Sequence, residues 1–238
     1  MTNDTRFAGK LALVTGASRG IGAATAEALG AAGAHVILTA RTASGLEAVE
    51  EKIHAAGGSA TIAPLDLIDS DNIAKLAAAV ADRWPSLDIM VLNAAMLGSL
   101  SPVEHLDAKE LAKIFATNVF ASQAMIAAFD PMLRRSDKAE LVGLTSSVAS
   151  EPRAFWGGYA ASKAAFENLL LTYADETAHA GKLRVHIVDP GATRTRMRQN
   201  AFPGEEPSSL KGPESVAAAI LDQLGSDAAT GCRVRIEG

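Results

Sequence analysis

The chain has 238 residues, of which 48% are hydrophobic, and a formal net charge of −5 at pH 7. This size and composition predict one compact α/β domain, residues 1–238, with a large core. The mild acidity gives no reason to expect a nucleic-acid partner. Because the N-terminus is polar and no apolar run approaches ~18 residues, we expect neither a signal peptide nor a membrane partner, and a cytoplasmic location.

Cysteine and histidine give no sign of a disulfide or a metal. The single cysteine, Cys232, excludes an internal disulfide and is interpreted as a small buried apolar residue rather than a redox group. The five histidines are scattered, without a close pair or a cysteine neighbour, so we expect no metal site.

Apolar, β-branched runs alternate with Ala-, Leu- and Glu-rich helical stretches along the chain. We expect strands at 11–15, 35–40, 60–64, 89–93, 140–145, 184–188 and 233–236. Helices are expected at 21–32, 44–56, 71–83, 107–135, 159–180 and 213–224. This alternation predicts a doubly wound α/β fold, a seven-stranded parallel sheet with helices on both faces and ligands at the carboxyl ends of its strands.

The first expected strand runs into Gly16-Ala-Ser-Arg-Gly20-Ile-Gly22, and a helical stretch follows. A strand that turns on glycines into a helix presents backbone N–H groups and the positive helix end to a pyrophosphate. The spacing is one residue off the common dinucleotide fingerprint, so a glycine-rich turn without a ligand is the alternative.

Tyr159 and Lys163 stand four residues apart in a helical stretch and therefore share one helix face. A cation held beside a phenol favours the phenolate and moves its pKa down from ~10. Reversible carbonyl reduction needs such a group, which gives a proton to a forming alkoxide and takes it back. By itself this spacing can arise by chance.

Together the two motifs resemble those of the short-chain dehydrogenase/reductase family, and the resemblance runs from about Lys10 to the last residue. It implies a Rossmann-like oxidoreductase with the catalytic residues Asn118, Ser146, Tyr159 and Lys163. In the family the serine donates a hydrogen bond to the developing oxyanion. Thr145 and Ser147 flank Ser146, so its register is an assumption.

The resemblance also assigns roles to the lysine and the asparagine. Lys163 would lower the pKa of Tyr159 and bind the nicotinamide ribose. Asn118 would kink its helix and hold a water for proton relay. The alternative for Asn118 is a polar mid-helix residue that bonds back to the preceding turn.

The resemblance implies a cofactor site at the ends of the strands. Asp66 would bind the adenine amino group, and Thr193 and Thr195 the carboxamide and pyrophosphate. The implied cofactor-binding residues are Gly16, Ser18, Arg19, Gly20, Ile21, Gly22, Arg41, Asp66, Leu67, Asn93, Ala94, Ala95, Tyr159, Lys163, Pro190, Gly191, Thr193 and Thr195.

The end of the second expected strand indicates which nicotinamide cofactor binds. An acidic residue there would repel a 2′-phosphate, but the chain has Thr39-Ala40-Arg41. Arg41 and Arg19 can bracket a 2′-phosphate with bidentate hydrogen bonds, which favours NADP(H) over NAD(H). The alternative is that both arginines merely face solvent.

The resemblance implies a substrate pocket lined by Met96, Leu97, Phe155, Trp156, Met197 and Phe202, and these apolar residues suit a largely apolar substrate. Met96 replaces a family glycine and would crowd the substrate side. We expect an enzyme that interconverts a small-molecule ketone and a secondary alcohol. A 3-oxoacyl thioester reductase is the alternative within the class, and a non-catalytic NADP-binding sensor is the alternative outside it.

Two further expectations concern assembly and a lid. The expected helices at 107–135 and 159–180 carry apolar residues on too many sides for one buried face. Family members commonly pair these helices across a two-fold axis, which implies a homodimer or homotetramer. The segment 194–212, rich in Arg, Pro, Glu and Gly, is predicted to be a mobile substrate lid, without a regular helix at 202–207.

Overall fold

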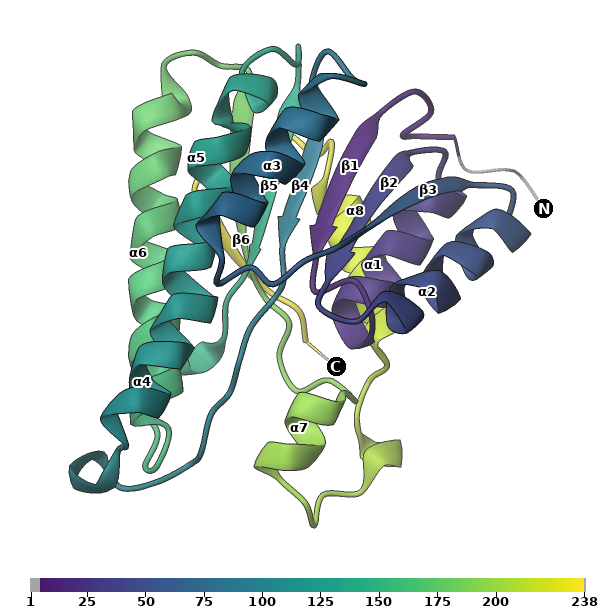
Figure 1. Cartoon of the computed structure of the whole chain (residues 1–238). Helices are drawn as coiled ribbons and strands as arrows, with labels where there is room; N and C mark the ends of the chain where they lie inside the picture. The colour runs from purple at the N-terminus through teal and green to yellow at the C-terminus, as the bar shows by residue number, and fades with distance from the viewer. Residues whose placement is uncertain (1–4, 238) are drawn as a thin grey trace.

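The computed structural model describes residues 5–237. Seven strands form one parallel sheet in the order β3-β2-β1-β4-β5-β6-β7 (Figure 1). The strands are β1 (Leu11–Thr15), β2 (His35–Ala40), β3 (Ser59–Pro64), β4 (Ile89–Leu92), β5 (Ala139–Leu144), β6 (Leu183–Asp189) and β7 (Cys232–Arg235). The helices are α1 (Gly20–Ala31), α2 (Ala43–Ala55), α3 (Ser70–Ala81), α4 (Ala108–Phe115), α5 (Ala121–Leu133), α6 (Gly157–Ala178), α7 (Arg196–Ala201) and α8 (Pro213–Gln223). This confirms the predicted doubly wound, Rossmann-like fold.

Helices cover both faces of the sheet (Figure 1). On one face α1, α2 and α8 bury a core that includes Leu29, Leu46 and Ile220. On the other face α3, α5 and α6 bury a core that includes Phe129 and Phe166. Because both faces are covered, the central strands β1, β4 and β5 are buried along their whole length rather than on alternate residues.

The site is positioned by a reversal in the strand order. From β1 the chain builds outward to β2 and β3, then returns to place β4 on the other side of β1. The loops that leave the carboxyl ends of β1 and β4 therefore diverge and open a crevice between them.

The expected single helix at 107–135 is interrupted. A π-helical turn, Ala116–Phe120, separates α4 from α5, and Asn118 lies in it. Such turns are frequent at functional sites because they release a backbone group from the helix. The correction agrees with the kink that the family resemblance implies at Asn118.

Within the described residues, one helical stretch, Ala108–Leu133, is long and apolar enough to cross a membrane by length and composition alone. Polar residues such as Asn118 and Ser122 interrupt it, which is why no unbroken apolar run is visible in the sequence. Met125, Phe129 and Met132 from this stretch are buried in the core against the sheet. The stretch therefore packs as a core helix, with its inner face buried against the sheet.

The lid segment 194–212 is more regular than predicted. Its ends meet, since the Arg194 amide donates to the Lys211 carbonyl at 2.9 Å. Its first half forms α7, because the Thr195 hydroxyl caps the helix by accepting from the Arg198 amide at 3.2 Å. Pro203 and Gly204 form a turn, and Pro207 begins a short 3-10 helix, Pro207–Ser209, so no regular α-helix covers 202–207, as expected.

Cys232 also differs from its prediction. It starts the edge strand β7 and is half-buried rather than buried. An edge strand has a neighbour on one side only, so its side chains keep part of their exposure.

Candidate active site

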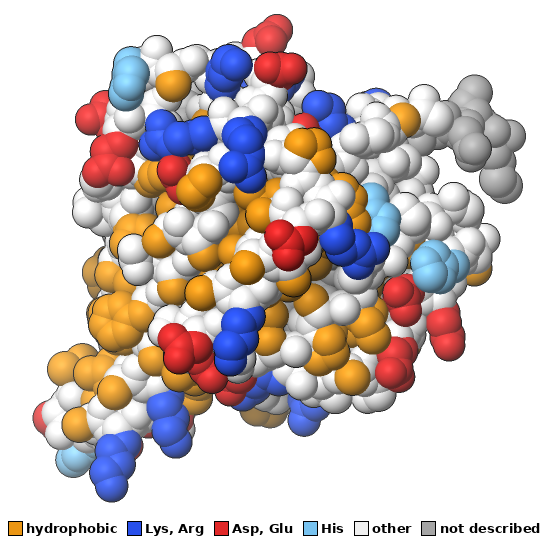
Figure 2. All heavy atoms as spheres, turned by 45° about the horizontal axis from the view of Figure 1, so that its top comes forward, with side chains coloured by type: hydrophobic (Ala, Val, Ile, Leu, Met, Phe, Trp, Pro, Cys, Tyr) orange, Lys and Arg blue, Asp and Glu red, His pale blue; other side chains and the backbone are white. Residues whose placement is uncertain are grey.

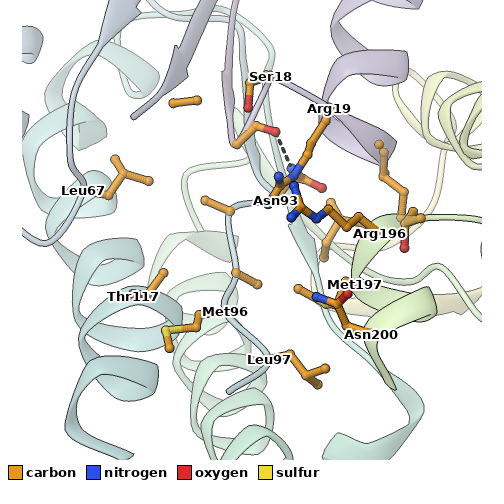
Figure 3. A pocket seen from close by; sticks show the side chains of 18 of the residues that line it. Ser18, Arg19, Leu67, Asn93, Met96, Leu97, Thr117, Arg196, Met197 and Asn200 are labelled. Atoms are coloured by element: carbon orange, nitrogen blue, oxygen red, sulfur yellow. Dashed lines mark hydrogen bonds between the residues drawn. The ribbon is translucent and has the colours of Figure 1, made fainter. Parts of the chain in front are cut away.

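A cleft of about 950 Å³ opens at the carboxyl ends of the strands. Its walls are built by the glycine loop, the ends of β2 to β5, α6 and α7, and Figure 3 shows their side chains converging on one space. This volume is at the upper end for small-molecule and cofactor sites.

The glycine loop has the geometry of an anion site. A Cβ on Gly22 would lie 2.4 Å from both Asn93 Nδ2 and Gly16 O, so only glycine allows this close approach. Arg19, at the N-cap of α1, makes no side-chain cap, and the first turn carries no acidic residue. The free N–H groups of that turn therefore face the cleft with the positive end of the helix, which fits a dinucleotide pyrophosphate.

Asn93 holds this loop in place. Its Nδ2 donates to the carbonyl oxygens of Thr15 at 2.9 Å and Gly16 at 3.2 Å. The Thr15 hydroxyl accepts from the amides of Asn93 at 2.9 Å and Ala94 at 3.1 Å, and it donates to Val91 O at 3.2 Å. Thr15 was missed by sequence reasoning, and its only signal is a hydroxyl residue at the last position of the first strand.

Tyr159 and Lys163 lie together on the cleft wall, both buried. Lys163 Nζ is 5.9 Å from the centre of the Tyr159 ring and donates to Leu144 O at 2.6 Å. Burial lowers the pKa of Lys163 to about 8. Burial, together with the Asp189 carboxylate, raises the pKa of Tyr159. This direction is opposite to the expected one, because burial favours the neutral form of the phenol.

Asn118 joins the π-helical turn to the loop after β4. Its Oδ1 accepts from the Met96 amide at 2.7 Å, and its Nδ2 donates to Met96 O at 2.9 Å. Nδ2 also donates to Ser162 Oγ at 2.9 Å, and that hydroxyl donates to Tyr159 O at 2.7 Å. Asn118 therefore connects the substrate loop to the helix that carries Tyr159, and Ser162 is a second residue that the sequence did not reveal.

Ser146 follows β5 and is partly exposed. Its neighbour Thr145 lines the cleft, and the Thr145 hydroxyl donates to Glu167 at 2.7 Å. The register that was assumed for the serine therefore stays an assumption. Ser146 is not part of the cleft wall, and its catalytic role stays a prediction.

Most of the implied cofactor residues line the cleft. They are Gly16, Ser18, Arg19, Gly20, Ile21, Arg41, Asp66, Leu67, Asn93, Ala94, Ala95, Tyr159, Lys163, Pro190 and Thr195. Gly22, Gly191 and Thr193 lie behind the wall and shape it. A Cβ on Gly191 would lie 2.7 Å from Ile236 O, and the Thr193 hydroxyl donates to Pro190 O at 3.1 Å.

The implied substrate residues divide into two groups. Met96 and Met197 line the cleft (Figure 3). Trp156 and Phe202 stack beside it, with ring centres 5.7 Å apart, and Trp156 packs edge-on against Tyr159 at 6.0 Å. Phe155 is 57% exposed at a positive φ of 72° and takes no part in the wall.

Leu97, implied for the pocket, and Arg196, implied for its rim, also line the cleft. The wall further contains Leu100, Thr117 and Asn200, which sequence reasoning did not single out, and Figure 3 shows Met197 and Asn200 presented by α7. Their placement depends on the path of the lid and of the loop after β4. No local sequence pattern marks either path.

Comparison with known proteins agrees with this geometry. The family model for short chain dehydrogenases matches residues 10–206. The Escherichia coli (strain K12) oxidoreductase YciK is 38% identical over 221 residues, which cover 92% of this chain and 87% of that protein. Glucose 1-dehydrogenase of Gluconobacter oxydans (strain 621H) is 34% identical over 214 residues, which cover 88% of this chain and 78% of that enzyme.

Solved structures show the same arrangement. A short chain dehydrogenase of Shigella flexneri 2a str. 301, complexed with NADP, has a TM-score of 0.93 and 36% identity, and the match covers 98% of this chain and 99% of that one. A short chain dehydrogenase of Escherichia coli CFT073, complexed with NADPH, has a TM-score of 0.93 and 36% identity, with 99% of each chain covered. The chain belongs to the short-chain dehydrogenase/reductase family and is an oxidoreductase of that family.

Proposed function

We propose that this protein is an NADP(H)-dependent oxidoreductase that interconverts a ketone and a secondary alcohol. One observation carries the proposal. Tyr159 and Lys163 lie on the wall of the same cleft as a glycine loop whose free helix N-terminus suits a pyrophosphate. A protein that only bound the dinucleotide would have no use for a buried phenol in the cleft.

The nicotinamide, when bound, supplies or accepts the hydride. Tyr159 acts on the proton. Its raised pKa keeps the phenol protonated at neutral pH, which suits the donor of a proton to the oxygen of a ketone that is being reduced. Lys163, with a pKa of about 8, still carries its charge at pH 7 and stabilises negative charge on the phenol oxygen as the proton leaves.

Ser146 and Asn118 complete the proposed set. The Ser146 hydroxyl donates a hydrogen bond to the carbonyl oxygen of the substrate, where negative charge develops. Asn118 acts by position, because its amide is engaged with Met96 and Ser162. It sets the distance between the substrate loop and Tyr159.

NADP(H) is the proposed cofactor because the cleft wall carries Arg19 and Arg41 and the end of β2 has no carboxylate. Two related structures were solved with NADP and NADPH, which supports this choice. The wall on the substrate side is mainly apolar, with Met96, Leu97 and Met197, so the substrate presents an apolar group beside its carbonyl.

A panel of ketones with NADPH, and of secondary alcohols with NADP, tests the proposal by the change in nicotinamide absorbance. Graded ketones, 3-oxoacyl thioesters among them, separate the two substrate classes by kcat/KM. The proposal expects turnover in at least one direction. Binding of NADPH without turnover on any member would favour a sensor instead.

We propose in addition that the protein forms a homodimer or homotetramer through α5 and α6. Phe120, the last residue of the π-helical turn before α5, is 63% exposed, and Leu171 on α6 is 42% exposed. Figure 2 shows hydrophobic side chains gathered along the left and lower-left side of the molecule, where α4 to α6 lie. Light scattering should give an oligomeric mass for the natural chain and a lower mass for Phe120→Glu. A monomeric mass for the natural chain at micromolar concentration would contradict the proposed homodimer or homotetramer.

A further inference from the structure

The lid helix touches the glycine loop across the cleft. A Cβ on Gly20 would lie 3.5 Å from Thr195 Cγ2, which is an ordinary van der Waals contact. The residues next to this contact, Arg19 on one side and Arg196 on the other, both line the cleft. Figure 3 shows their side chains pointing toward one another over Asn93.

These two guanidinium groups have no protein counter-charge. Among residues 5–237, neither Arg19 nor Arg196 has an ion pair or a side-chain hydrogen bond. By contrast, Arg198 on the same helix is held by Glu205 through two hydrogen bonds of 2.6 Å. Both side chains are exposed, so solvent screens their repulsion, but two unpaired like charges that face each other still favour an anion between them.

The carboxylates of the cleft wall lie elsewhere. Asp66 stands at the end of β3 and accepts from the Ile68 amide at 3.1 Å. Glu214 lies with Arg194 beside Gly212, since a Cβ on Gly212 would lie 2.2 Å from Glu214 Oε2 and 3.4 Å from Arg194 Nη2. Arg196 is therefore the lid arginine that faces the glycine loop without a carboxylate beside it.

The position of this charge indicates which anion it meets. Thr195 touches Gly20, the first residue of α1, so Arg196 lies by the free N–H groups of the first turn. The pyrophosphate of a dinucleotide binds at such a helix end. Arg41, which we assign together with Arg19 to a 2′-phosphate, follows the last residue of β2, whereas Arg196 lies on the lid.

We propose that Arg196 is a further cofactor-binding residue, which contacts the pyrophosphate from the lid. The inference rests on the proposed binding of NADP(H). A bound dinucleotide then replaces a repulsion between the lid and the glycine loop by an attraction. Cofactor binding and the closed position of α7 are coupled through this residue.

Calorimetric titration of NADPH and NADH tests the inference. Pyrophosphate is common to both dinucleotides, so Arg196→Gln should weaken the binding of NADPH and of NADH by a similar factor. The expected factor is roughly tenfold for one charge-assisted contact. Arg196→Lys should recover part of the affinity because it keeps the charge. Arg41→Gln should weaken the binding of NADPH alone. Arg83→Gln, which removes a charge away from the cleft, should leave the binding of both dinucleotides unchanged.

The outcomes separate this inference from the proposed function. A natural chain that binds neither dinucleotide overturns the proposed cofactor and this inference with it. A natural chain that binds both, with Arg196→Gln binding equally well, overturns the inference alone. Loss of NADPH binding alone in Arg196→Gln also overturns it, since the arginine would then meet the 2′-phosphate. Thermal unfolding of each variant shows that its fold is retained.

Discussion

Lys163 donates a hydrogen bond of 2.6 Å from its ammonium to the carbonyl oxygen of Leu144, the last residue of β5. The bond ties the helix that carries Tyr159 to the strand that precedes Ser146. It also holds a positive charge in a buried place, and this has a consequence for stability that can be measured.

Lys163→Met should change how stability depends on pH. Burial lowers the folded-state pKa of Lys163 to about 8, against 10.5 in the unfolded chain. Between these values the unfolded chain binds more protons, so the natural chain gains stability as pH rises. The stability of the variant relative to the natural chain should therefore fall across this window, by up to about 3 kcal/mol.

Urea unfolding of both proteins at several pH values between 7 and 10.5 measures this difference. Ionisable groups away from Lys163 are common to both proteins, so their contributions to the difference largely cancel. A difference that stays constant with pH would show that Lys163 keeps an ordinary pKa in the folded protein.

Thr15→Val should destabilise the protein through the glycine loop. The hydroxyl accepts from the Asn93 and Ala94 amides, which valine leaves without a partner at nearly the same volume. Unsatisfied amides cost about 1–3 kcal/mol, which lowers Tm by several degrees. Thr172→Val, at an exposed hydroxyl on α6, is the matched control and should leave Tm nearly unchanged. Equal Tm values for Thr15→Val and Thr172→Val would show that the Thr15 hydroxyl does not stabilise the glycine loop.

Phe202→Ala should loosen the lid. Phe202 stacks on Trp156 at 5.7 Å, and the guanidinium groups of Arg198 and Arg153 lie 3.8 Å and 4.8 Å from its ring centre. These contacts hold the end of α7 against the loop that leads to Tyr159. Limited trypsin digestion should cut the variant faster within 194–212 than the natural chain. Phe120→Ala, at an exposed phenylalanine elsewhere, should be cut within 194–212 no faster than the natural chain. Equal rates of cutting for the natural chain and both variants would show that the contacts of Phe202 do not hold the lid.

The sequence predicts the residues whose neighbours are near in the chain. Tyr159 and Lys163 share a helix face by spacing, and the glycine loop follows its strand directly, so both could be placed before the structure was known. The doubly wound sheet follows in the same way from alternating strands and helices. The family resemblance implied a kink at Asn118, but the local pattern continues as one helix through it and did not predict the π-helical turn.

The contacts that could not be predicted join residues that are far apart in the sequence. Thr15 meets Asn93 only because β1 and β4 are neighbours in the sheet, and Arg196 faces Arg19 only because the lid folds back over the glycine loop. The direction of the Tyr159 pKa shift was wrong for a related reason. Spacing shows that a cation is near, but the degree of burial, which decides the shift, belongs to the folded protein.

Tyr159, in the proposed reaction with NADP(H), moves the proton. The variant Tyr159→Phe isolates this role, because the ring and its packing against Trp156 stay while the hydroxyl is lost. On the best ketone of the panel, we expect kcat to fall by about 10²–10⁴-fold, with the NADPH dissociation constant nearly unchanged. A Tyr159→Phe variant that binds NADPH and turns over at the natural rate would contradict the account.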